Sequence, residues 1–302
     1  MRRFTIQGKG GHLSALEFGR AGGPIDVVFL HATGFCAQTY RHLLEPMGPQ
    51  RRVVALDLRG HGHCTLPARP ARLSSWATYA DDVIPALEQL AGDERPPRVL
   101  AGHSMGATVS MLALSRRPGL ADSLLMIDPP LVLPEVRRWL LLPFGTEVWR
   151  RRQPLARSAT RRRAEFPGRE AVLKSYRGRG AFRTWSPGFL EDYVEGGFMA
   201  APGGTVRLRC SPEWESATFA AQRHDLRAAL SALRVRSMML VPEHGSTAEK
   251  GLPLVRSLAP HVSIERIPAT SHFLPMERPD LVRDYLDRML GAGERAEGDS
   301  PA

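Results

Sequence analysis

Short apolar runs alternate with longer amphipathic stretches along the first half of the chain. The runs fall at residues 27–30, 53–56, 98–101 and 124–127, and turn-forming residues separate them from the amphipathic stretches. Strands that are almost wholly apolar are typical of a parallel sheet, because helices cover both of its faces and leave no strand surface for water. The pattern therefore predicts an α/β fold with a mostly parallel central sheet flanked by helices.

The pattern changes after Pro129 and Pro130, where tryptophans, arginine clusters and helix-like segments replace the apolar runs. Runs at 237–241 and 263–267 then resume the sheet, and residues 278–290 have helical spacing. We therefore predict a core built from 1–130 and 233–290, with a mostly helical cap from 131–232. Residues 291–302 lack apolar periodicity and are predicted to be a disordered tail.

A Gly-x-Ser-x-Gly motif stands between a predicted strand and a predicted helix, in the segment 98–106, RVLAGHSMG. A serine at such a place needs a tight strand-to-helix turn, and Gly102 and Gly106 leave room for the backbone to bend. The helix that follows directs the positive end of its dipole at developing negative charge, and the backbone N–H of Met105 can donate to that charge. We predict Ser104 as a nucleophile.

With this motif the chain resembles the α/β-hydrolase family, in its esterase- and lipase-like form with a helical cap after the sixth strand. The segment 28–40, VFLHATGFCAQTY, is similar to the family's His-Gly loop, which brings a second oxyanion-hole N–H over the nucleophile. Ala32 stands where the family usually has glycine, and by position the donor is the N–H of Thr33, within the stretch 33–35. The segment 55–62, ALDLRGHG, is similar to a structural loop of the family.

The segment TSHFLPMERP supplies His272, which follows a predicted strand and precedes the terminal helix as the family's catalytic histidine does. An imidazole can take the proton of a serine hydroxyl and return it to a leaving group near neutral pH. We predict His272 as the general base.

Two residues are candidates for the acid that orients this histidine. The family usually places an aspartate in the loop after the seventh strand, but that loop reads VPEHGST, with Gly245 at the usual position and Glu243 nearby. Asp128, in MIDPP after the strand that follows the nucleophile helix, occupies a site from which some members of the fold orient the histidine instead. We favour Asp128, with Glu243 as the alternative, and either carboxylate would hold the imidazole tautomer.

Composition and charge bear on the partners of the protein and on the compartment in which it works. Its 302 residues carry a net charge of +10, but no nucleic-acid motif accompanies that charge, so we predict no nucleic-acid partner. The three cysteines, Cys36, Cys64 and Cys210, have no paired metal spacing and favour a reducing, cytoplasmic compartment. No run approaches the roughly 18 apolar residues of a membrane span, so we predict no stable membrane insertion. The oligomeric state stays open.

Other clusters have two interpretations each. His31, His61 and His63 resemble metal ligands in type, but neither a His-Glu-x-x-His motif nor paired cysteines accompany them, and we predict no metal and no cofactor. Arginines at 137–138, 150–152 and 161–163 either bind an anion or form solvated helix faces. Cap aromatic residues either line a pocket above Ser104 or form the core of the cap; they are Trp139, Trp149, Trp185, Phe189 and Tyr193.

These residues predict a serine hydrolase that cleaves a carboxylic ester of a small molecule through an acyl-enzyme. Thioester, lactone and C–C bond hydrolysis use the same residues and stay open as alternatives. A non-catalytic ligand-binding protein on the same fold is the alternative of a different class.

Overall fold

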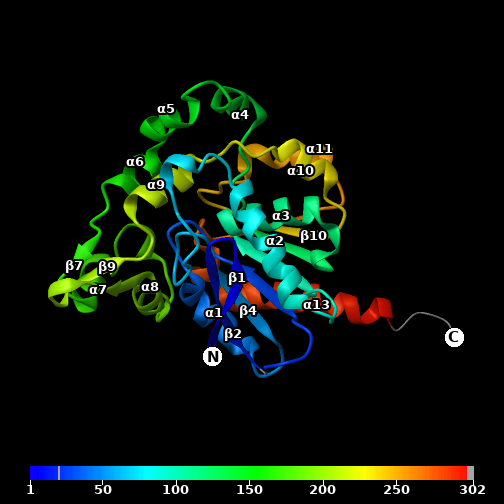
Figure 1. Ribbon diagram of the computed structural model, residues 1–302. Helices are drawn as coiled ribbons and strands as arrows, with labels where there is room; N and C mark the ends of the chain where they lie inside the picture. Colours follow the sequence, from blue (N-terminus) through cyan, green and yellow to red (C-terminus); the bar gives the residue numbers. More distant parts are fainter. Residues whose placement is uncertain (20, 298–302) are drawn as a thin grey trace.

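An eight-stranded sheet forms the centre of this computed structural model, which describes residues 1–19 and 21–297 (Figure 1). Its strand order is β1-β2-β4-β3-β5-β6-β10-β11. The pairs β1–β2 and β2–β4 are antiparallel, and every other neighbouring pair is parallel. The six apolar runs are strands, which confirms the predicted fold class. The bounds are β1 Arg2–Gly8, β2 Gly11–Phe18, β3 Val27–Leu30, β4 Val53–Asp57, β5 Val99–His103, β6 Ser123–Ile127, β10 Arg236–Pro242 and β11 Ser263–Ile267.

Alternate residues of the central strands enter two separate apolar cores. Val28 and Leu30 of β3 pack with α2 (Ala77–Ala91) and α3 (Met105–Arg116) on one face of the sheet. Val27 and Phe29 pack with α1 (Arg41–Leu44) and α13 (Pro279–Glu297) on the other. Because side chains alternate between the faces of a strand, helices on both faces require apolar residues at every position, as these strands have.

We call the chain between β6 and β10 the cap, and Figure 1 shows most of it, from α4 to α9, above and to the left of the central sheet. Besides its helices it holds a three-stranded sheet, β7-β9-β8, whose strands of two or three residues are too short to give a sequence pattern. The last of these helices, α10, packs on α3 in the core. The bounds are α4 Pro134–Leu140, α5 Gly145–Arg152, α6 Pro154–Thr160, β7 Glu165–Phe166, α7 Arg169–Tyr176, α8 Phe189–Gly197, β8 Phe198–Ala200, β9 Val206–Leu208, α9 Pro212–Ala220 and α10 Leu226–Ala232.

The C-terminal segment corrects one prediction. The helix α13 continues to Glu297, whereas the sequence predicted disorder from residue 291; the GERAE segment is rich in good helix formers, which explains the continuation. Residues 298–302 of the predicted tail lie outside the described residues. Two short helices, α11 (Leu252–Leu258) and α12 (Leu274–Glu277), complete the fold. Within residues 1–19 and 21–297, no helix combines the length and the apolar content needed to cross a membrane.

The carboxylate of Asp57 fastens three segments at the end of β4. It accepts hydrogen bonds from the amides of Ala37 and His63 and pairs with the guanidinium of Arg3 at 2.9 Å. Burial alone would raise the pKa of Asp57, but His63 and Arg3 outweigh burial and hold that pKa well below its ordinary value. The stabilisation is therefore present above the unfolded-state pKa of about 3.9 and is lost as the pH falls toward the folded-state value.

We expect Asp57→Asn to lower the free energy of unfolding at pH 7 by about 3 kcal/mol, because it leaves buried donors and Arg3 without their charged partner. Urea denaturation at pH 7 and pH 3 measures this change. The difference in unfolding free energy from wild type should be smaller at pH 3. That pH lies below the unfolded-state pKa, so part of the stabilisation by the Asp57 carboxylate is already lost. Asp93→Asn, at an exposed carboxylate, is the matched control; an equal loss of stability in both variants would contradict the assignment.

Candidate active site

Ser104 lies in a strained turn between β5 and α3. Its φ of 54° and ψ of −121° are unfavourable for a residue with a side chain. A Cβ atom on Gly102 would stand 2.4 Å from the carbonyl carbon of Gly106, and one on Gly106 would stand 2.2 Å from the carbonyl oxygen of Leu30. Glycine is therefore required at both positions, as the motif predicted, because the strand, turn and helix approach too closely for any other residue.

The imidazole of His272 lies between Ser104 and Asp128. Its Nε2 is 3.1 Å from Ser104 Oγ, and its Nδ1 is 2.5 Å from Asp128 Oδ2. A carboxylate accepts, so Nδ1–H donates to Asp128 and the unprotonated Nε2 accepts from the serine hydroxyl. Ser104 and Asp128 are 24 residues apart in the chain, and Asp128 and His272 are 144 apart, yet the three side chains meet at one point. A serine in this arrangement can give its proton to the imidazole as it attacks.

The carboxylate of Asp128 is fully buried and is surrounded by donors from the loop after β10. Its Oδ1 accepts from Ser246 Oγ at 2.6 Å and from the amides of Thr247 and Ala248. Burial raises the pKa of Asp128, but His272, Ser246 and Thr247 outweigh it and lower that pKa below its ordinary value. Asp128 is therefore ionised at neutral pH, and the loop in which the family usually carries the acid supplies its hydrogen-bond donors instead.

Glu243 lies at the start of this loop but has a different partner. Its carboxylate accepts a hydrogen bond of 2.7 Å from the amide of Ala269, which has a φ of 55°. The amide of the next residue, His244, donates to the carbonyl of Thr270. Glu243 thus holds the turn that precedes His272, while the structure brings Asp128 to the imidazole itself.

The amides of Thr33 and Met105 face no acceptor within the described part of the chain. The neighbouring amides do have partners: Phe35 donates to the carbonyl of Ala32, and the amide of Gly34 faces the sulfur of Cys210. Within the stretch 33–35, Thr33 therefore offers the available donor, and Met105 offers another from the first turn of α3.

A series of hydrogen bonds, not anticipated from the sequence, joins the loop of Thr33 to the backbone of His272. The amide of Ala32 donates to the hydroxyl of Tyr40, which donates to Nδ1 of His103 at 2.7 Å, and Nε2–H of His103 donates to the carbonyl of His272 at 2.7 Å. Burial lowers the pKa of His103 to about 3, so the ring is neutral and has the one tautomer that satisfies both partners. The network fixes both sides of the site relative to Ser104.

A cavity of about 280 Å³ opens beside Ser104 and His272. Thr33 lies on its wall, to which six aromatic residues also contribute: Phe35, Tyr176, Phe182, Tyr193, Phe219 and Phe273. Of the cap aromatic residues predicted as lining, only Tyr193 borders this cavity. Trp139 and Trp149 pack against each other with ring centroids 6.4 Å apart, and Trp185 and Phe189 are likewise part of the packing between cap and core.

The cation on the cavity wall is neutralised by an acid. The guanidinium of Arg162 pairs with Glu215 of α9 at 2.6 Å and donates to the hydroxyl of Tyr193 of α8 at 2.6 Å. Burial alone would lower the pKa of Arg162, but Tyr193 and Glu215 raise it above its ordinary value, so the pair is ionic. The pair joins three segments of the cap beside the cavity that Ser104 and His272 border, and no sequence signal distinguished Arg162 from its neighbours.

Two of the histidines considered as metal ligands, His31 and His61, have backbone groups as hydrogen-bond partners. His31 accepts from the amide of Leu58 at 3.0 Å and donates to the carbonyl of Ala32, and His61 lies 2.9 Å from the carbonyl of Arg59. Burial lowers the pKa of His61 to about 3. In the part of the chain that the structure describes, no three His, Cys, Asp or Glu side chains are grouped as metal ligands would be.

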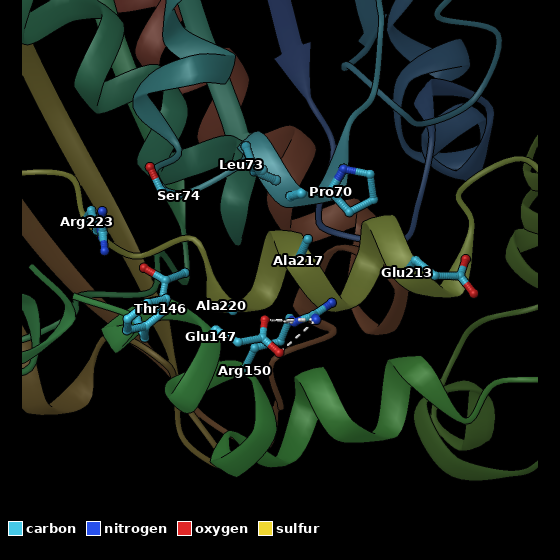
Figure 2. Close-up of a pocket in the computed structure, with 12 residues that line it drawn as sticks. Pro70, Leu73, Ser74, Thr146, Glu147, Arg150, Glu213, Ala217, Ala220 and Arg223 are labelled. Carbon is cyan, nitrogen blue, oxygen red and sulfur yellow. Dashed lines mark hydrogen bonds and ion pairs between the residues drawn. The ribbon is translucent and has the colours of Figure 1, made fainter. Parts of the chain in front are cut away.

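A second hollow, of about 610 Å³, lies between α5 and α9 (Figure 2). Glu147 and Arg150 pair across its wall at 2.8 Å, with Glu213 and Arg223 at its ends. It contains neither Ser104 nor His272, so its greater volume does not make it the site of chemistry.

Comparison with known proteins agrees with this geometry. The profile of the alpha/beta hydrolase family matches residues 27–285. The chain therefore belongs to the α/β-hydrolase family.

The relatives are similar to limited parts of the chain. Protein phosphatase methylesterase 1 of Bos taurus is 38% identical over 111 residues, which are 35% of this chain and 28% of that protein. The 2-(acetamidomethylene)succinate hydrolase of Mesorhizobium japonicum is 30% identical over 109 residues, which are 36% and 37% of the two chains. The matches thus span well under half of either relative.

Solved structures match over nearly the whole chain. The crystal structure of E-2-(acetamidomethylene)succinate hydrolase has a TM-score of 0.78 at 21% identity and covers 96% of this chain and 99% of that one. The thioesterase domain from the curacin biosynthetic pathway has a TM-score of 0.76 at 18% identity and covers 95% and 98%. At these identities the likeness shows the fold alone.

Proposed function

We propose that the protein hydrolyses a carboxylic ester of a small molecule, with Ser104 as nucleophile, His272 as general base and Asp128 as the acid that orients it. The observation that carries the proposal is the imidazole of His272, hydrogen-bonded to Ser104 Oγ through one nitrogen and to the buried Asp128 through the other. Glu243 is the rejected alternative, because its carboxylate is occupied by the amide of Ala269.

The reaction proceeds through an acyl-enzyme. Ser104 Oγ forms a bond to the ester carbonyl carbon while its proton passes to Nε2 of His272; the C–O bond to the alcohol then breaks, and the alcohol takes that proton. Water repeats the sequence: it attacks the acyl carbon, gives a proton to Nε2, and the acid leaves as Oγ recovers the proton. Asp128 stays ionised throughout and stabilises the imidazolium.

The oxyanion that forms at each addition is stabilised by the amides of Thr33 and Met105. Both belong to rigid segments, since His31 and Tyr40 hold the first loop and α3 carries the second amide. Donors that are already in place need no reorganisation when charge develops on the carbonyl oxygen, and each contributes a factor of roughly 10² to 10³ in kcat.

The cavity favours an uncharged acyl group. Its aromatic wall offers apolar contact, and Glu215 neutralises the charge of Arg162, so an anionic substrate group would meet no unpaired cation there. One relative is named a methylesterase, which agrees with ester chemistry. Another relative is named for a substituted succinate, which carries carboxylates. An ester with a terminal carboxylate on its acyl group is therefore the substrate to compare with a neutral ester.

Labelling with a fluorophosphonate tests the mechanism. We expect one adduct per chain by intact mass, mapped to the Ser104 peptide, because only a serine activated by a neighbouring base reacts readily. A folded protein that acquires no adduct, or acquires it elsewhere, would contradict the proposed nucleophile.

Hydrolysis of p-nitrophenyl butyrate and of mono-p-nitrophenyl succinate then tests the substrate class. We expect a higher kcat/KM for the neutral ester. Labelling at Ser104 together with a preference for the succinate would keep the mechanism and overturn only the choice of acyl group.

The cellular setting rests on separate grounds. The thiols of Cys36, Cys64 and Cys210 are all unpaired, and the cytoplasmic location remains a prediction from their number and spacing.

A further inference from the structure

One cap segment carries the exposed apolar side chains and most of the net charge of the protein. Apart from Met1, every large apolar side chain that is exposed within the described residues lies between 139 and 155: Trp139, Leu141, Leu142, Phe144 and Leu155. Residues 134–163 also contain nine arginines and two glutamates, and therefore seven of the ten net positive charges of the chain. We infer that this segment docks the protein on an anionic lipid surface.

The tip of the segment exposes its side chains at a cost in free energy. Leu141, Leu142 and Phe144 follow one another between α4 and α5, and Phe144 is 82% exposed with a φ of 60°. A bulky residue rarely adopts this left-handed backbone, and an aromatic ring gains nothing from water. The neighbouring Gly145 is fixed by close packing, since a Cβ there would stand 2.6 Å from the carbonyl of Trp139. Packing thus holds the tip outward.

Only part of the charge around the tip is paired within the protein. Arg150 and Arg151 pair with Glu147, and Arg162 pairs with Glu215. Four other arginines of the segment are exposed and have no acidic partner in the described ranges: Arg138, Arg152, Arg157 and Arg161. An anionic bilayer supplies an apolar interior for the tip and headgroup charges for these guanidinium groups at one surface.

A lipid surface fits this segment better than a protein partner. Figure 1 shows α4 and α5 at the outer end of the cap, away from the central sheet. Exposed apolar side chains such as Leu142 and Phe144 can enter a bilayer without a matching groove, which a protein partner would have to supply. Leu155 also borders the cavity beside Ser104, so one of the exposed apolar side chains of the segment lies at that opening. The docking is peripheral, which agrees with the lack of a membrane-spanning helix in the described residues.

Vesicle sedimentation tests the inference without any measurement of catalysis. We expect wild type to pellet with phosphatidylcholine vesicles that contain 30% phosphatidylglycerol as an experimental choice, and far less with phosphatidylcholine alone. Replacing Arg138, Arg152, Arg157 and Arg161 by glutamine should weaken partitioning by at least about tenfold. The matched control replaces Arg95, Arg117, Arg227 and Arg256, exposed arginines outside the segment, and should retain most of the binding.

The double variant Leu142→Ser/Phe144→Gly tests the tip. Glycine adopts the left-handed backbone freely, so the variant should keep its thermal stability while its partitioning falls by at least about fivefold. Failure of wild type to bind anionic vesicles, or equal losses in the two arginine variants, would overturn the inference. So would a concentration-dependent dimer in sedimentation velocity that Phe144→Gly abolishes, because the tip would then be an interface between copies. None of these outcomes bears on labelling at Ser104.

Discussion

Ser104→Ala is expected to lower kcat for p-nitrophenyl butyrate by a factor on the order of 10⁶ and to abolish fluorophosphonate labelling. The substitution removes the atom that attacks and leaves the cavity, His272 and the two available amides unchanged. Fold should be retained, because serine and alanine meet the same backbone strain at a φ of 54°. What activity remains would come from binding and the oxyanion donors alone.

Ser158→Ala provides a matched control. This serine borders the same cavity, but the structure places no hydrogen bond between it and His272 among the described residues, so both kcat and labelling should stay close to wild type. Turnover by Ser104→Ala within tenfold of wild type, measured with freshly purified protein to exclude a contaminating esterase, would contradict the assigned nucleophile. A parallel loss in Ser158→Ala would point to damage of the cavity as a whole.

Much of the fold could be predicted because the strands are buried on both faces. Burial on both sides makes β3, β4, β5 and β6 continuous, mostly apolar runs, which a sequence displays directly. The hairpin of β1 and β2 gave no such signal, since β1 lies at the edge of the sheet and only Ile6 in it is buried. The glycines around Ser104 were likewise predictable, because their need for space is local.

Features that depend on distant contacts could not be predicted. Nothing near Asp128 in the chain indicates that Ser246 and Thr247 will surround its carboxylate with donors. The sequence likewise gives no sign that Arg162 pairs with Glu215, because the segment contains many arginines. The sequence therefore identified the candidate acids but could not choose between them on physical grounds; only the hydrogen bonds of each carboxylate make that distinction.

Asp128→Asn is expected to lower kcat by about 10⁴ with little change in KM. In the wild type, Oδ1 accepts from Ser246, Thr247 and Ala248, while Oδ2 accepts from Nδ1 of His272. An asparagine would keep its oxygen toward the three donors and turn its NH₂ group toward the imidazole. Nδ1 would then accept and Nε2 would carry the hydrogen, so the ring could no longer take the proton of Ser104.

Glu243→Gln is the decisive comparison, because a glutamine oxygen can still accept from the amide of Ala269 and the turn before His272 should persist. We expect its kcat to lie within a few fold of wild type, against the loss of about 10⁴ in Asp128→Asn. The reverse order would make Glu243 the acid, and it would require the turn at Ala269 to rearrange when substrate binds. Small and equal losses would mean that the tautomer of His272 is held by neither carboxylate. The contrast between the variants thus tests whether a loop can exchange its acid for hydrogen-bond donors and leave the chemistry of the serine intact.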